Sequence, residues 1–133
     1  MSAIGIQLSS PTNRTVEGPQ IQFDRGGLIV KYDYQSDDGS IKWEKILFFD
    51  VLSVEYNQAA CCSEDSVVSA REIRTTSISS RLTEMTKRWK ESVGWQDWQQ
   101  EQGGASRFKH FTIFFDDAGC VEVIAASCEV REV

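Results

Sequence analysis

The sequence predicts an α+β fold in which a curved antiparallel sheet packs against one main helix. Alternating apolar and polar residues occur in both halves of the chain, and one strongly one-sided helical segment lies between them. The regular alternation of strands and helices that builds parallel sheets is missing. With 133 residues, 41% hydrophobic and 26% charged, the chain has the size and composition of a soluble domain, and we expect residues 1–133 to form one domain.

The first half has the pattern of an antiparallel meander. After a short apolar alternation at residues 4–8 and a polar loop, the stretch LIVKYDYQ alternates with the period of a half-buried strand, with one side formed by Leu28, Val30, Tyr32 and Tyr34. The sequence SDDGS then predicts a hairpin turn in which Gly39 takes a positive φ.

The return strand begins with Ile41 and Trp43 on one side and becomes apolar on both faces at residues 46–49. We expect a bend or bulge near Asp50 to reset the facing of the residues that follow, which are Leu52, Val54 and Tyr56. Residues 57–78 allow two interpretations. Ser63 suits the cap of a short helix, and VVSAREI equally suits a strand.

A helix is predicted over residues 80–93. Its apolar side chains recur every three or four residues and form a narrow stripe suited to lying on a sheet, namely Leu82, Met85, Trp89 and Val93. Gly94 occupies the position of a C-terminal cap.

Residues 107–131 predict a long C-terminal hairpin. One face of its first strand carries Phe111, Ile113 and Phe115, and the other carries Phe108, His110, Thr112 and Phe114. The turn DDAG places Gly119 in the left-handed position. The small residues 125–127 predict close approach by another element, such as the helix.

The charge of the chain indicates which kinds of partner it can bind. The net charge is −6, and the segment 71–90 carries +4, so the rest of the chain carries −10. Such a body repels phosphate backbones and anionic lipids, so we expect neither nucleic acid nor a membrane as partner. The basic segment is typical of the wet face of a helix, although Arg74 and Arg81 could bind an anion.

No motif for a cofactor, a metal or a catalytic nucleophile occurs, so we expect none of them. His110 lies six residues before Asp116, about 20 Å away on an extended strand, so that carboxylate cannot orient it. We expect the imidazole to have no chemical partner. The four cysteines lack the spacing of zinc ligands, and we expect buried, unpaired thiols in a cytoplasmic protein with no secretory signal or membrane span.

Trp95 and Trp98 lie in a strongly polar stretch. They fit either a loop tucked against the sheet or an exposed binding anchor surrounded by polar residues such as Asp97 and Glu101.

These features favour a non-enzymatic interaction protein that presents an acidic surface to a basic protein partner, as immunity proteins and antitoxins do. One alternative is a small-molecule-binding protein or enzyme whose pocket lies between sheet and helix, lined by Trp43, Phe111 or Trp89 with Arg74 or Arg81 as anion anchor. The other alternative is a structural homo-oligomer, of which a homo-dimer is the simplest form.

Overall fold

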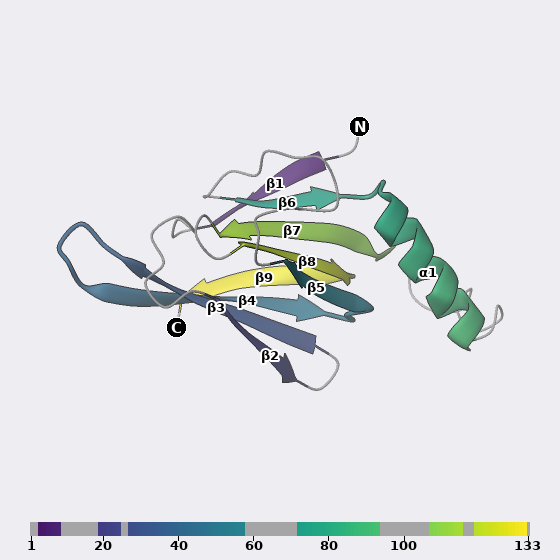
Figure 1. Cartoon of the computed structure of the whole chain (residues 1–133), viewed down its shortest axis with the longest axis horizontal. Helices are drawn as coiled ribbons and strands as arrows, with labels where there is room; N and C mark the ends of the chain where they lie inside the picture. The colour runs from purple at the N-terminus through teal and green to yellow at the C-terminus, as the bar shows by residue number, and fades with distance from the viewer. Residues whose placement is uncertain are drawn as a thin grey trace.

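A computed structural model describes residues 3–8, 19–24, 27–57, 72–93, 107–115 and 119–132. In these residues the chain forms nine strands and one helix (Figure 1). Their bounds in chain order are β1 Ala3–Gln7, β2 Gln20–Asp24, β3 Gly27–Gln35, β4 Ile41–Phe49, β5 Ser53–Asn57, β6 Glu72–Thr76, α1 Ser80–Val93, β7 Lys109–Phe115, β8 Gly119–Ala125 and β9 Ser127–Glu132.

The strands form two antiparallel sheets, where the sequence predicted one. The first has the order β1-β6-β7-β8-β5 and the second the order β2-β3-β4-β9. The α+β class and the two hairpins, β3-β4 and β7-β8, are confirmed. The predicted meander is not continuous, because residues 53–57 form β5 in the first sheet while β3 and β4 lie in the second. The predicted curvature is not confirmed, because neither sheet is strongly curled. The C-terminal run also does not stay in one sheet, since β9 leaves β8 and pairs with β4.

The sheets are joined at a corner where two paired strands bend together. Phe49 pairs with Ser127 in the second sheet, and Ser53 pairs with Ile124 in the first. Between these pairs, residues 50–52 face residues 125–126, so one strand carries an extra residue. Asp50 absorbs the bend with a positive φ of 54°. The bend predicted near Asp50 is therefore confirmed, and its effect is to pass both strands from one sheet to the other.

The main core lies between the sheets. Its centre consists of apolar side chains from β3, β4, β7 and β8, among them Val30, Phe48, Phe111, Ile113 and Val123. Phe48 meets Phe111 edge to face, with ring centroids 5.4 Å apart. The predicted inward face of residues 111–115 is thus confirmed.

Helix α1 covers one end of the first sheet on the side away from this core (Figure 1). Leu82, Phe108 and Ile124 form a second apolar cluster, against which Met85, Trp89, Leu52 and Ala126 pack. The helix bounds and the facing of Leu82, Met85 and Trp89 agree with the sequence, as does the close approach at Ala126. Burying this stripe, rather than helix propensity alone, stabilises a helix of this length.

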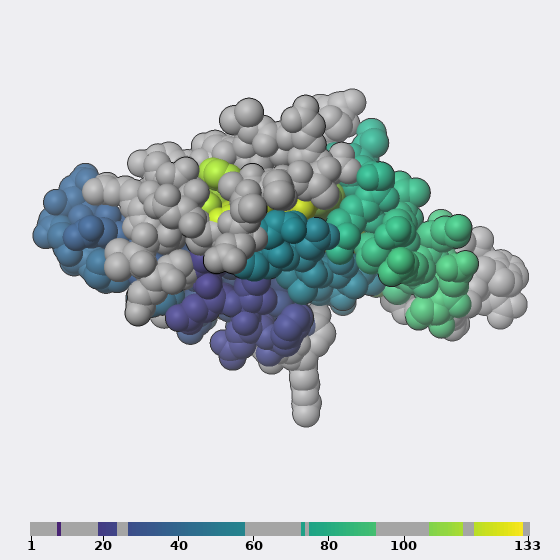
Figure 2. All heavy atoms as spheres, viewed as in Figure 1, coloured from purple at the N-terminus to yellow at the C-terminus, as the bar shows by residue number. Residues whose placement is uncertain are grey.

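The hairpin of β3 and β4 extends beyond both neighbouring strands. β2 pairs only with residues 27–31 of β3, and β9 pairs only with residues 44–49 of β4. Residues 34–43, which we call the hairpin arm, therefore have no strand pairing other than that between β3 and β4 among the strands that the structure describes. The arm projects at the left of Figures 1 and 2. Gly39 at its tip has a φ of 86°, as the turn sequence predicts.

Of residues 57–78, for which the sequence allowed two interpretations, the structure decides the second part. Residues 72–76 form β6, which pairs with β1 and β7, so the end of VVSAREI is a strand. The alternative based on Ser63, the cap at Gly94 and the DDA part of the last turn lie outside the described residues. Gly119 has the predicted positive φ, 101°. Within the described ranges, no helix is both long enough and apolar enough to cross a bilayer.

Candidate functional site

The outward face of the first sheet holds a group of polar side chains joined by hydrogen bonds and an ion pair. Its residues alternate with those of the main core, so they point away from it, toward the side where α1 lies. They are Ser53, Glu55 and Asn57 on β5, His110 and Thr112 on β7, and Glu122 on β8. We call this group, together with Ser79 and Arg81, the polar face.

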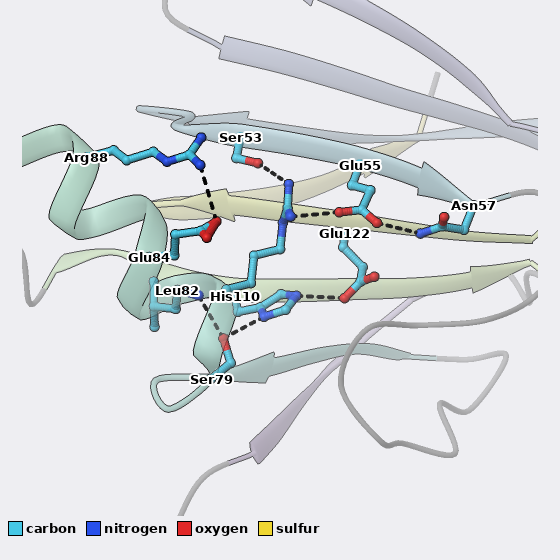
Figure 3. Close-up of polar contacts among 10 residues, drawn as sticks. Ser53, Glu55, Asn57, Ser79, Leu82, Glu84, Arg88, His110 and Glu122 are labelled. Atoms are coloured by element: carbon cyan, nitrogen blue, oxygen red, sulfur yellow. Dashed lines mark hydrogen bonds and ion pairs between the residues drawn. The ribbon is translucent and has the colours of Figure 1, made fainter.

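His110 is the centre of the polar face. Its Nδ1 lies 2.8 Å from Oγ of Ser79, and its Nε2 lies 2.9 Å from Oε1 of Glu122 (Figure 3). The strand register explains the second contact. His110 pairs with Ile124, so Glu122 is its diagonal neighbour on the same face. Neither side chain of this pair has exposed surface.

Ser79 connects the imidazole to the start of α1. The backbone N–H of Leu82 donates to Oγ of Ser79 at 3.0 Å, so Ser79 is the N-cap of the helix. Every atom in this chain of contacts has a compatible role when the imidazole carries its proton on Nε2. In that form Nε2–H donates to Glu122, Nδ1 accepts from the Ser79 hydroxyl, and the hydroxyl oxygen accepts from Leu82.

Arg81 forms the second half of the polar face. Its guanidinium lies 2.7 Å from Oε1 of Glu55 and donates to Oγ of Ser53 at 2.8 Å. The other carboxylate oxygen of Glu55 accepts from the Asn57 side-chain amide at 2.9 Å. These contacts attach the first turn of α1 to the edge strand β5, next to the attachment that Ser79 makes to β7.

The order serine–histidine–glutamate is that of a nucleophile, a general base and an orienting carboxylate. Burial decides what the arrangement can do here. His110 and Glu122 have no surface that a substrate could touch, and Ser79 is 7% exposed with its oxygen already accepting a backbone hydrogen bond. The geometry therefore suits a structural network that fixes the helix on the sheet.

The prediction that His110 has no chemical partner is wrong. The carboxylate that meets His110 belongs to the neighbouring strand β8, and its position depends on the strand register. One signal was present: Glu122 interrupts the apolar run CVEVIA at a position that shares a face with His110.

The other predicted site residues are only partly tested. Trp95, Asp97, Trp98 and Glu101 lie outside the described residues, so their binding role stays a prediction. Arg74 lies on β6, paired with Gly5 and Thr112. Arg81 already has the carboxylate of Glu55 as its partner.

The aromatic residues proposed as a pocket lining do not meet. Phe111 faces the main core, and Trp89 packs on Phe108 in the second cluster, with ring centroids 5.1 Å apart. Trp43 belongs to the other sheet.

The prediction of unpaired thiols is wrong for Cys120, which is disulfide-bonded and fully buried. It is confirmed for Cys128, which is free and packs partly buried against the main core. Burial raises the pKa of the Cys128 thiol to about 11, so it stays protonated near neutrality.

A second buried polar pair lies in the other sheet. The Tyr32 hydroxyl donates to Oε1 of Glu44 at 2.8 Å, and both residues are fully buried. Burial, followed by the hydrogen bond to Glu44, raises the pKa of the Tyr32 phenol far above its usual range. Glu44 lies on the inward side of β4, together with Ile46 and Phe48. Ile41 and Trp43, which the sequence placed on one side of the strand, lie on the opposite side from Glu44. Ile41 is 47% exposed.

Comparison with known proteins gives no relative: no family model, no curated protein and no solved structure matches this chain.

Proposed function

We propose that this protein is a non-enzymatic binding module that offers an acidic surface to a basic protein partner, in the manner of an immunity protein or antitoxin. The observation that carries the proposal is the hairpin arm, residues 34–43, which extends past its neighbouring strands (Figure 2). Projecting elements that are already ordered bind with a smaller loss of conformational entropy than flexible loops do.

The arm is ordered at both ends. At its base, Tyr32 donates to Glu44 and meets Phe115 edge to face at 5.5 Å. At its tip, Asp38 accepts from the Ser40 backbone N–H at 2.9 Å and from the hydroxyls of Ser36 and Ser40. These contacts favour one shape for the turn before any partner arrives.

The arm also has the side chains that an interface needs. Asp37 and Asp38 are exposed at the tip, and the exposed Ile41 lies beside the half-buried Trp43 two residues further on. The acidic tip agrees in sign with the whole chain, whose net charge is −6. A basic partner would be attracted over a Debye length, and the apolar residues would then add contact area.

The test is affinity capture from the native host with a matched pair of variants. The arm variant is Asp37→Lys with Ile41→Ser, and the control is Glu91→Lys with Ile78→Ser. The control changes the same charges at exposed positions on and before α1. We expect one basic protein to be captured by the wild type and the control in stoichiometric amount, less at high salt, and at least about 10-fold less by the arm variant. Equal loss in both variants, or capture that salt does not affect, contradicts the proposal.

One observation favours a second candidate, an enzyme that uses Ser79 with His110 and Glu122. That candidate requires the helix start to move so that the Ser79 hydroxyl becomes accessible. A fluorophosphonate probe decides between the two, because it labels only activated serines. The binding module predicts no label on Ser79, whereas stoichiometric labelling that is lost in His110→Ala would establish the enzyme.

The homo-oligomer stays a third alternative, which no contact in the described part of the chain favours. Size-exclusion chromatography with light scattering tests it directly. A concentration-independent monomer would exclude it.

A further inference from the structure

Cys120 gives the chain a covalent constraint that the proposed function does not use. It lies within β8, pairs with Asn57 of β5 on one side and Phe114 of β7 on the other, and has no exposed surface. It is disulfide-bonded, whereas Cys128, eight residues later, is free. The chain has four cysteines, so the remaining two are the adjacent Cys61 and Cys62.

Cys61 and Cys62 lie only a few residues beyond the strand that pairs with the segment of β8 around Cys120. Asn57 lies directly opposite Cys120, and Cys61 and Cys62 follow Asn57 by four and five residues. A stretch of that length reaches about 13 to 18 Å when extended, more than enough to return to the neighbouring strand. The alternation along β8 also places Cys120 on the outward face, next to Glu122 of the polar face.

We propose that Cys120 forms a disulfide with one cysteine of the Cys61–Cys62 pair, and that the protein matures in an oxidising compartment. Formation of the bond oxidises two thiols and releases two protons, and the two electrons reduce a low-molecular-weight or protein disulfide to two thiols. Such bonds persist where the surroundings are oxidising and are rare in the cytosol. The bonded Cys120 therefore counts against the cytoplasmic location that the sequence predicted.

The bond would act on the unfolded state more than on local packing. It joins segments about 60 residues apart in sequence, and a cross-link over such a loop removes much of the freedom of the unfolded chain. Full burial of Cys120 keeps small thiols away from the native bond, so reduction requires the region around β5 and β8 to open first.

The first test counts thiols in the full chain, refolded in a glutathione redox buffer and alkylated after denaturation without reductant. We expect two alkylated cysteines, one of them Cys128, and two protected ones. A peptide map then shows whether Cys61 or Cys62 is bonded to Cys120. Four alkylated cysteines, or protection of Cys128, would overturn the proposal.

The second test compares thermal stability. The wild type is denatured and reduced with excess dithiothreitol and then refolded in its presence, and its Tm should be lower than that of the oxidised protein by roughly 10 °C or more. The matched variants are Cys120→Ala and Cys128→Ala. Cys120→Ala should have the lower Tm without reductant and be insensitive to it, while Cys128→Ala should keep the wild-type response. If Cys120→Ala does not fold, the wild-type comparison still decides, since an unchanged Tm on reduction contradicts the proposal. Neither test depends on any partner, so the result is independent of the binding function.

Discussion

Two buried glutamates, one in each sheet, show how differently the same residue can be held. Glu122 lies on the outward face of the first sheet and meets His110, which continues through Ser79 to the start of α1. Glu44 lies on the inward side of the second sheet and meets Tyr32, whose ring packs on Phe115 at the base of the hairpin arm. Both pairs join strands that already pair with each other, but only His110 has a further contact, through Ser79, with the start of a helix.

The two pairs, His110–Glu122 and Tyr32–Glu44, differ in the part of the molecule that each one holds in place. Loss of the His110–Glu122 contact would weaken the support that His110 gives to Ser79, at the start of a helix that is otherwise held by one small apolar cluster and by the contacts of Arg81 with β5. Loss of the Tyr32–Glu44 contact would leave the β3–β4 ladder and the aromatic packing intact. Buried polar pairs of similar geometry should therefore differ in their contribution to stability, with the His110 pair contributing more.

The largest effect is expected for His110→Ala. It removes the imidazole contact from the fully buried Glu122 and opens space under α1, so the free energy of unfolding should fall by roughly 3 kcal/mol. Chemical denaturation measures the change. A matched Glu122→Gln variant retains the acceptor oxygen toward Nε2–H and should lose less. An equal loss in both variants would mean that the carboxylate charge matters more than the hydrogen-bond geometry.

Tyr32→Phe should have the next largest effect. The ring stays in place against Phe115 while the hydroxyl donor to Glu44 is lost, so stability should fall by about 2 kcal/mol. Tyr34→Phe, on the same side of β3 but half-buried, is the control and should change stability little. If Tyr32→Phe costs more than His110→Ala, the ranking of the two pairs is reversed.

Ser79→Ala separates the helix cap from the imidazole. The variant removes the acceptor for the Leu82 N–H and the hydroxyl partner of Nδ1, and a loss of about 1 kcal/mol is expected. Hydrogen exchange should rise in the first turn of α1 and remain unchanged in β3 and β4. The exposed Ser77 provides the control, since Ser77→Ala removes a hydroxyl outside the helix. Uniformly faster exchange across both sheets would argue against a local role.

The smallest effect concerns the tip of the arm and its dependence on pH. Hydrogen bonds from Ser36 and then Ser40 hold the pKa of Asp38 below its usual range. Because the pKa is lower in the folded state, the turn is most stable above about pH 4, the ordinary pKa of aspartate, and loses that stability as the pH falls further. The amide resonance of Ser40 should report the change, and in Asp38→Asn it should not titrate. A wild-type midpoint of about 4 would contradict the shift.

Local pattern was sufficient for much of the fold. The helix over residues 80–93, the hairpin turn at Gly39, the bend near Asp50 and the two faces of β7 all follow from periodicity and turn chemistry, which depend on neighbours in sequence. Polar residues inside strands were interpreted less well. His110 was expected to have no partner, and neither Glu44 nor Glu122 was recognised as buried, since a polar residue in an alternating strand is usually exposed.

By itself, the amino-acid sequence determined the class of elements, their approximate bounds and the acidic balance of the chain, because each depends on composition or on residues a few positions apart. The tertiary structure alone decided that the strands divide into two sheets at a shared corner, that His110 meets Glu122 and Ser79, and that Cys120 is bonded while Cys128 is free. Those outcomes depend on register and on which segments distant in sequence come together, and a shift of a single residue in either strand would turn the same side chains to the opposite face.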